Sequence, residues 1–245
     1  MMARAMALNG AHKVYIIGRR KAALESAAKS VTTDNIIPIV GDVTSKETLK
    51  SIADQIEKEV GYINVLIANS GIGGPQAKIT SQTTLEDFQK QMWETDFDDY
   101  VSTFSINTAA VWYTVMAFLI LLDKGNKKGN VEQRSQVIAT SSIGGFNRLA
   151  PGGYAYGQSK AGTTLMMKQL ATALAPYRIR SNAICPGREF DLACHNYCEM
   201  LTAKQYIHQT WQRPLLRRRT ISFLRVLFPW SAWGQKRKWR VLYST

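Results

Sequence analysis

Hydrophobic and polar positions divide the chain into short apolar runs separated by longer segments of helical period. The short runs are rich in β-branched residues and predict strands at residues 13–17, 36–40, 63–68, 135–140 and 179–184. The longer segments predict helices at residues 1–9, 21–31, 44–60, 85–99, 101–122 and 154–175. Because strands alternate with helices, we expect an α/β fold with a Rossmann-like, doubly wound parallel sheet.

Three local signals bear on this assignment. Residues 63–68 form a continuous apolar run, which indicates a strand buried on both faces of a parallel sheet. Pro38 lies inside the run at 36–40 and lacks a backbone donor, so its missing donor must face outward or the pairing must be irregular. Thr44 and Glu47 have the spacing of a capping box, which predicts that a helix begins there.

Polar residues and turn formers follow directly on the predicted strands. In a sheet of this kind, ligands bind in the crevice beyond the carboxyl ends of the strands, so residues at these positions converge on one edge. The residues concerned are Arg19, Asp42, Asn69, Ser142 and the pair Pro186 and Gly187. Their common position predicts a ligand site at that edge of the sheet.

Tyr156 and Lys160 stand four residues apart at the start of the last predicted helix. This separation places two side chains on the same helix face, one turn apart. An ammonium group beside a phenol favours the phenolate and makes proton transfer by that phenol feasible near neutral pH. Tyr154 competes with Tyr156, but it lies six residues from Lys160 and therefore off that face. An ordinary tyrosine and lysine on a solvated helix face is the alternative interpretation.

A set of motifs resembles the short-chain dehydrogenase/reductase family over about residues 1–187. In chain order the motifs are Asp42-Val43, Asn69-Ser70-Gly71, Asn107, Ser142, Tyr156-x-x-x-Lys160 and Pro186-Gly187. The resemblance implies a nicotinamide-dependent carbonyl reductase or secondary alcohol dehydrogenase that acts on a small organic molecule. Secondary metabolism uses such enzymes widely, and we include it among the expectations.

The resemblance also implies a role for each catalytic candidate. Tyr156 would be the general acid/base at the substrate oxygen, and Lys160 would support the phenol and hold the nicotinamide ribose. Ser142 would orient the substrate carbonyl, and Asn107 would anchor a water-linked proton relay. Ser141 competes with Ser142, but Ser142 stands before a small turn ending in glycine, as the family serine does. Hydroxyl groups can supply the hydrogen bond and the proton that a reduced carbonyl oxygen needs, and no metal is required.

The predicted cofactor is NADP, because Arg19 and Arg20 follow the first predicted strand and no acidic residue appears before Glu25. Arginine binds phosphate bidentately, whereas NAD sites place a carboxylate at this position to bind the ribose hydroxyls. A solvated arginine pair that opens a helix is the alternative. The resemblance adds cofactor contacts at Asp42, Val43, Asn69, Gly71, Tyr156, Lys160, Pro186 and Gly187.

Two stretches depart from the family pattern. The family begins with a strand and a turn of the form T-G-x-x-x-G-x-G, which holds the pyrophosphate, and this sequence contains no such motif. Residues 1–5 resemble the helix that follows that turn, and residues 188–245 show no pattern of the family's final βα unit. We therefore expect an incomplete sheet, with a Rossmann-like catalytic domain at residues 1–187 and a basic, tryptophan-rich tail at 188–245.

The positive charge is concentrated in that tail. Residues 188–245 hold 11 Lys or Arg and 3 Asp or Glu, so they carry +8 of the net charge of +13. Residues 1–187 are too weakly basic to indicate nucleic-acid binding. In the tail, basic residues lie between tryptophans, a pattern that resembles an RNA-binding or membrane-binding surface. A read-through or frame-shifted end is the plainer interpretation. Cys194, His195 and Cys198 offer three zinc donors where a closed site needs four, so we expect no metal.

The remaining expectations concern the setting of the protein. Three cysteines are too few for a disulfide scaffold and no targeting signal is visible, so we expect a cytoplasmic protein. The apolar runs at 115–122 and 223–233 are too short to span a bilayer. The family commonly assembles through two long helices, here about 101–122 and 156–175, which implies a homo-oligomer. The alternative to an enzyme is a non-catalytic relic or binding module of the same fold.

Overall fold

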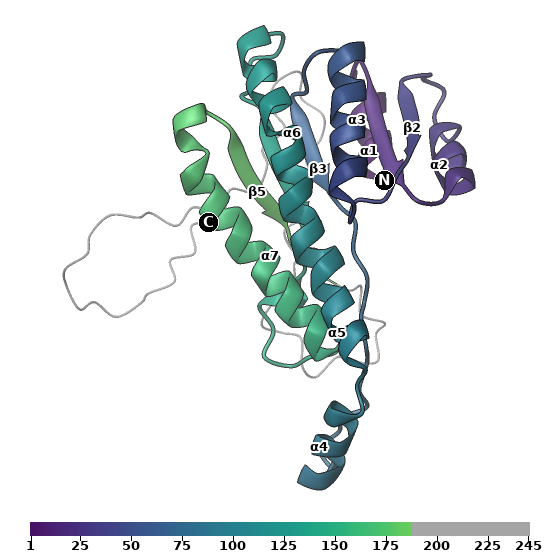
Figure 1. The fold of residues 1–245 in the computed structure, drawn as a ribbon, viewed down its shortest axis with the longest axis vertical. Coiled ribbons are helices and arrows are strands. Elements are labelled where there is room, and N and C mark those ends of the chain that lie inside the picture. The colour runs from purple at the N-terminus through teal and green to yellow at the C-terminus, as the bar shows by residue number, and fades with distance from the viewer. Residues whose placement is uncertain (188–245) are drawn as a thin grey trace, which may run out of the picture. The chain divides into compact units, whose positions relative to one another are not determined.

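The computed structural model describes residues 1–187, and the expectations for residues 188–245 lie outside them (Figure 1). The strands are β1 (Val14–Gly18), β2 (Ile36–Val40), β3 (Val65–Ala68), β4 (Gln136–Thr140) and β5 (Arg180–Ile184). The α-helices are α1 (Met2–Leu8), α2 (Lys21–Ala28), α3 (Lys46–Glu59), α4 (Leu85–Trp93), α5 (Phe97–Phe104), α6 (Ala110–Lys128) and α7 (Tyr154–Ala173). A π-helical turn, η1 (Ser105–Ala109), and the 3-10 turns η2 (Ile143–Gly145) and η3 (Ala175–Tyr177) complete the order.

Every strand pairing in the described residues is parallel, which confirms the α/β fold with a parallel sheet. β1 pairs with β2, and β4 lies between β3 and β5 in a second ladder. Within residues 1–187, no ladder joins β1 to β3. This break agrees with the incomplete sheet that the sequence analysis expects.

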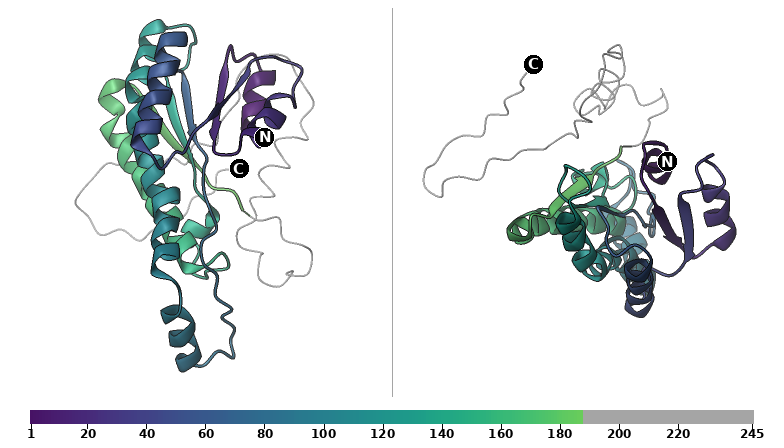
Figure 2. Two further views of the ribbon diagram at one scale, coloured as in Figure 1. Left: turned by 45° about the vertical axis from the view of Figure 1, so that its right-hand side comes forward. Right: turned by 90° about the horizontal axis from the view of Figure 1, so that it is seen from above.

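Side-chain packing joins the two ladders into one core. Helices α6 and α7 lie on one face of the β3–β4–β5 ladder, and α3 packs beside α6 in the same layer (Figure 2). Leu49 of α3, Leu122 of α6, Val137 of β4 and Met167 of α7 are all buried between these layers, and Ile39 of β2 belongs to the same cluster. Burying each such side chain contributes about 1.5–3 kcal/mol. The core therefore fixes the carboxyl ends of the strands relative to α7.

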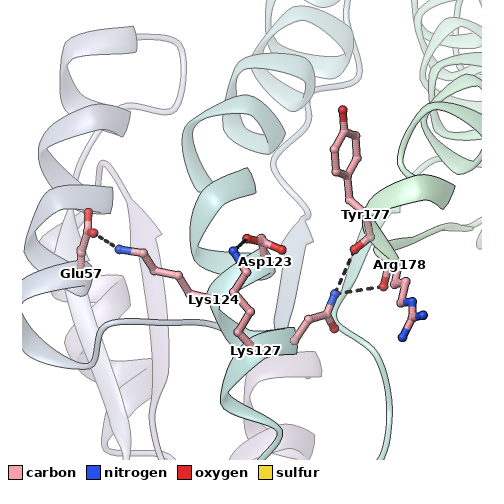
Figure 3. A network of polar contacts seen from close by, with 7 residues as sticks. Glu57, Asp123, Lys124, Lys127, Tyr177 and Arg178 are labelled. Atoms are coloured by element: carbon pink, nitrogen blue, oxygen red, sulfur yellow. Dashed lines mark hydrogen bonds and ion pairs between the residues drawn. The ribbon is translucent and has the colours of Figure 1, made fainter.

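Polar contacts tie the end of α6 to the elements beside it (Figure 3). Lys124 forms an ion pair with Glu57 of α3. The side-chain amide of Asn126 donates to the backbone carbonyls of Tyr177 at 3.3 Å and Arg178 at 3.0 Å, just before β5. These contacts fix α6 between α3 and the start of β5.

Two predicted helices differ most from those in the structure. The segment predicted at 85–99 divides into α4 and α5, because the Asp96 side chain accepts a hydrogen bond from Asp99 N at 2.9 Å and caps a new helix. The segment predicted at 101–122 is interrupted by η1 and continues to Lys128. A left-handed Gly129, with φ of 62°, ends it there. The helix end predicted at residue 122 is therefore wrong.

Two local predictions near β2 can be compared with the structure. Within the described residues β2 pairs with β1 alone, so Pro38, which is exposed, interrupts no second ladder. The capping-box prediction is displaced by one residue, because the N-cap of α3 is Ser45 rather than Thr44. Ser45 Oγ accepts a hydrogen bond from Thr48 N at 3.1 Å.

The continuous helical run Phe97–Lys128 is long and apolar enough, by length and composition, to cross a membrane. It is longer than the apolar run at 115–122 because α5, η1 and α6 follow one another without a break. Phe118 and Leu122 of this run lie in the core. The core helix of a soluble protein has the same properties, so length and composition do not assign this run to a membrane.

Candidate active site

Lys160 is a buried cation that lies one helical turn after Tyr156 on α7. Its Nζ donates to the carbonyl of Thr140, the last residue of β4, at 2.7 Å. The same Nζ lies 5.9 Å from the centre of the Tyr156 ring, and Lys160 is 4% exposed. Burial lowers the pKa of the Lys160 ammonium, and the nearby Cys185 acts in the opposite direction. The helix spacing thus brings a cation to the phenol, as the sequence predicts.

Ser142 lies beside the same ring, in the loop after β4. A Cβ on Gly144 would lie 3.3 Å from Ser142 Oγ and 3.3 Å from Tyr156 Cε1. Ser142 Oγ also accepts a hydrogen bond from Gly144 N at 3.0 Å, which holds the hydroxyl at the start of η2. The competing Ser141 points elsewhere, since its hydroxyl donates to the carbonyl of Lys160 at 2.8 Å. Of the two serines, Ser142 is the one beside the tyrosine.

Asn107 lies in the π-helical turn η1 and is fully buried. Its Oδ1 accepts from Ile72 N at 2.8 Å, and its Nδ2 donates to Ile72 O and Ser159 Oγ, both at 3.0 Å. The amide therefore clamps the loop after β3 against α7. Because protein groups occupy both of its polar atoms, the relay role implied by the resemblance stays a prediction.

Replacing Asn107 with alanine is expected to lower the free energy of unfolding by about 1–2 kcal/mol. The change removes three hydrogen bonds, but Ile72 is partly exposed and water can replace some of them. Urea denaturation measures the loss. Asn64→Ala is the matched control, because the Asn64 side chain makes one exposed hydrogen bond to Asn130 at 3.2 Å. Equal stability of the two variants would contradict the clamp.

The ends of β1 and β2 bring Arg19 and Asp42 together. Asp42 Oδ1 accepts from Thr44 N at 2.9 Å and from Thr44 Oγ1 at 2.7 Å. These hydrogen bonds hold the pKa of the Asp42 carboxyl below its usual range, and the charge of Arg19 adds a smaller attraction. Arg20 is exposed next to Arg19, and Val43 packs partly buried against the core. These predicted cofactor-binding residues thus share one edge.

The ends of β3, β4 and β5 are linked to one another. Thr140 Oγ1 donates to Asn69 Oδ1 at 2.9 Å, which joins β4 to the loop after β3. Ile143 N donates to the carbonyl of Pro186 at 3.1 Å, which joins η2 to the chain after β5. A Cβ on Gly187 would lie 3.2 Å from the Ile143 side chain. The residues predicted from these strand ends therefore lie around one edge.

Three residues with hydroxyl groups, none of them among the predicted site residues, hold this arrangement together. Thr140 binds both Lys160 and Asn69, as described above. Ser159 accepts from Asn107, and Thr163 Oγ1 donates to the carbonyl of Asn107 at 2.6 Å. Ser159 and Thr163 lie three and seven residues after Tyr156, on the helix face of Tyr156 and Lys160, so helical periodicity is the signal that identifies them.

Within residues 1–187, no group of three or more His, Cys, Asp or Glu side chains is placed to hold a metal ion. The candidate zinc donors Cys194, His195 and Cys198 lie outside the described residues.

A parallel α/β sheet with a tyrosine, a lysine and a serine gathered at the carboxyl ends of its strands is the arrangement of the short-chain dehydrogenase/reductase oxidoreductases. A family model described as short chain dehydrogenase matches residues 1–189, and the chain belongs to that family. The resemblance drawn from the motifs is thereby confirmed.

Individual relatives agree with this assignment. Short-chain dehydrogenase/reductase PhomF of Diaporthe leptostromiformis is 51% identical over 189 residues, which cover 76% of this chain and 64% of that protein. Short-chain dehydrogenase/reductase VdtF of Byssochlamys spectabilis is 43% identical over 209 residues, covering 76% of this chain and 68% of that protein. The chain thus spans less than two thirds of the length of PhomF.

Solved structures show the same fold. The Pseudomonas aeruginosa RhlG/NADP active-site complex superposes with a TM-score of 0.62 at 23% sequence identity. The superposition covers 78% of this chain and 68% of that one. At this identity, the likeness supports the arrangement of strands and helices and nothing finer.

Proposed function

We propose that this protein is an NADP-dependent oxidoreductase that interconverts a carbonyl group and a secondary alcohol on a small organic molecule. The observation that carries the proposal is the buried Lys160 ammonium, which Thr140 O holds 5.9 Å from the centre of the Tyr156 ring. Ser142 beside that ring supplies a second hydroxyl. The fungal relatives, named short-chain dehydrogenase/reductases, support a role in secondary metabolism.

The chain's own groups would manage the proton and the charge at the substrate oxygen. Bound nicotinamide would supply a two-electron reducing equivalent to the carbonyl carbon. The Tyr156 hydroxyl donates its proton to the oxygen as negative charge develops there, and the Lys160 cation stabilises the phenolate that remains. Ser142 Oγ donates a hydrogen bond to the same oxygen. In the direction of alcohol oxidation, the phenolate takes the proton back.

The residues present fit the two ends of a nicotinamide dinucleotide. A Cβ on Gly71 would lie 3.0 Å from Asn107 Oδ1 and 3.2 Å from Lys160 Nζ, so at this point bare backbone lies against the lysine. Gly71, Tyr156 and Lys160 would hold the nicotinamide end. Arg19, Arg20, Asp42 and Val43 would hold the adenosine end, while Asn69, Pro186 and Gly187 would flank the space between.

Two assays of the full chain test the proposal. Nucleotide fluorescence measures binding during titration with NADPH and with NADH, and NADPH oxidation is measured with a panel of aldehydes and ketones. Tighter binding of NADPH and turnover with at least one carbonyl are expected. Binding without turnover would favour a non-catalytic binding module of the same fold. Failure of both nucleotides to bind at millimolar concentration would contradict the proposal.

Replacing Arg19 with alanine is expected to weaken NADPH binding by about 10-fold and to leave NADH binding unchanged. Loss of a charge-assisted hydrogen bond to a phosphate costs about 1.5–3 kcal/mol, and NADH lacks that phosphate. Fluorescence titration measures both affinities. Arg134→Ala is the matched control, because Arg134 is exposed near the opposite end of β4. Equal weakening of both nucleotides by Arg19→Ala would show that the arginine does not select the cofactor.

We also propose a cytoplasmic homo-oligomer that assembles through α6 and α7. Ile120 of α6 and Leu165 of α7 are large apolar side chains that stand exposed in the described chain. Burying them against a second copy would remove apolar surface from water. Sedimentation of the full chain measures the mass of the assembly, and a monomer at micromolar concentration would contradict the proposal.

A further inference from the structure

The backbone carbonyl of Lys160 receives hydrogen bonds from two buried hydroxyl groups. Ser141 Oγ, directly after β4, donates to Lys160 O at 2.8 Å. Thr164 Oγ1, one turn later on α7, donates to the same oxygen at 3.0 Å. The two hydroxyl groups are also hydrogen-bonded to each other at 2.7 Å, with either one as the donor, and Ser141 is 2% exposed. This group of contacts is therefore closed to solvent.

Two further groups enclose the same peptide. Burial raises the pKa of the Cys185 thiol, directly after β5, and the nearby hydroxyl groups of Ser141 and Thr164 act in the opposite direction. A Cβ on Gly145 would lie 2.8 Å from the carbonyl carbon of Lys160, closer than the 3.0 Å that real side chains keep. The loop after β4 thus packs backbone against backbone on α7, at the residue that carries the buried ammonium.

The two hydroxyl groups bond to Lys160 O from different elements. Each has one proton to donate. A threonine inside a helix commonly donates to the carbonyl four residues earlier, so the bond from Thr164 stays within α7. The bond from Ser141 crosses from the end of β4 to the helix. Ser141 therefore joins the strand that carries Thr140 to the helix that carries Lys160.

Neighbouring residues in an extended segment project to opposite sides, so Ser141 faces the Lys160 peptide while Ser142 faces Tyr156. A shift of α7 along β4 would change the contact of Ser142 with Tyr156 and the bond from Lys160 Nζ to Thr140 O together. We propose that Ser141 is a positioning residue whose hydrogen bond to Lys160 O holds these groups in their reactive arrangement. The catalytic part of this inference rests on the proposed function.

Ser141→Ala removes the hydroxyl and keeps the rest of the side chain. Ser135→Ala is its matched control at the other end of β4, because Ser135 is 1% exposed and its Oγ has no hydrogen-bond partner. Thr164→Val removes the hydroxyl that bonds to Lys160 O within the helix and to Ser141 Oγ. Ser141→Ala and Ser135→Ala therefore compare the loss of a hydroxyl that joins two elements with the loss of a buried hydroxyl that has no partner.

The first measurement does not depend on activity. Each folded variant is labelled with trace acetic anhydride across a range of pH, and the labelling rate of each lysine is obtained by peptide mass spectrometry. Ser141→Ala is expected to raise the rate at Lys160 several-fold with the other lysines unchanged, because the bond to Thr140 O loosens. Ser135→Ala is expected to leave it unchanged. An unchanged Lys160 rate in Ser141→Ala would overturn the positioning role, whatever happens to the denaturation midpoint.

The second measurement uses turnover. Ser141→Ala is expected to lower kcat by roughly 10- to 100-fold, as misplacement of reacting groups does, while KM stays near the wild-type value and the pH of half-maximal rate moves. Wild-type kcat and an unchanged pH profile in Ser141→Ala would overturn the inference. A wild-type chain without turnover would instead contradict the proposed function, and the labelling of Lys160 would then decide the positioning role alone.

Discussion

Replacing Tyr156 with phenylalanine is expected to lower kcat by about 10²- to 10⁴-fold, the usual contribution of a positioned general acid. NADPH affinity is expected to stay unchanged, because the aromatic ring and the Lys160 ammonium beside it remain. The variant loses the O–H group alone, so the proton that the substrate oxygen needs has no donor at that position. Steady-state NADPH oxidation and fluorescence titration of the same preparation measure the two quantities.

Tyr154→Phe provides the matched control for this prediction. Tyr154 begins α7 two residues earlier, and its ring makes an edge contact with Phe88 at 6.1 Å between centroids. Removal of its hydroxyl is expected to leave kcat unchanged. If Tyr154→Phe and Tyr156→Phe lost turnover equally, the assignment of the acid would be wrong. Full activity of Tyr156→Phe would refute the proposed mechanism itself.

Replacing Gly125 with alanine is expected to lower the free energy of unfolding by about 2–3 kcal/mol, which shifts the urea midpoint downward. Gly125 lies inside α6, where a Cβ would overlap the backbone oxygen of Ile63 and lie 2.8 Å from Ser135 Oγ. A backbone oxygen cannot rotate away, so α6 must move from the strand it covers. The gain of about 0.5–1 kcal/mol from alanine's helix propensity offsets part of this loss.

Gly162→Ala separates the effect of the steric clash from the effect of alanine's helix propensity. Gly162 lies inside α7, where a Cβ would meet Thr108 at 3.5 Å, an ordinary van der Waals distance. The same substitution is therefore expected to stabilise the protein by about 0.5–1 kcal/mol. Opposite signs for the two variants test the close approach of α6 to Ile63. A stabilising Gly125→Ala would show that the helix has room to move.

The fold was predictable because its elements leave strong local signals. The continuous apolar run before Asn69 and the β-branched run at 36–40 predict strands of a parallel sheet, and both strands are present. Burial on both faces is not observed in the described residues, since Val65 of β3 and Val40 of β2 are exposed. The helix bounds were harder to predict, since they depend on single hydrogen bonds. Asp96 starts a new helix by binding Asp99 N, and an aspartate that caps a helix cannot be told from a solvated one by periodicity.

The position of the candidate site was predictable for a similar reason. Helical spacing alone places Tyr156 and Lys160 on one face, and strand ends place Asn69 and Ser142 at one edge. The contacts between elements were not predictable, because they depend on how α7 packs against β4. The sequence offers Ser141 as a competitor of Ser142, but the Ser141 hydroxyl instead donates a hydrogen bond to the carbonyl of Lys160.

The π-helical turn at Ser105–Ala109 has a consequence for the direction in which α6 faces. A π turn accommodates one residue more than an α turn, and each α-helical residue rotates the chain by about 100°. The π turn therefore absorbs one extra residue, and its removal would convert the turn into an α turn while α6 keeps nearly the same face toward the sheet. Removal of one residue within the regular part of α6 would instead rotate all that follows by about 100° and turn its apolar side away from the sheet. Of these two positions on the helix, the π turn is thus the one that tolerates a change of one residue in length.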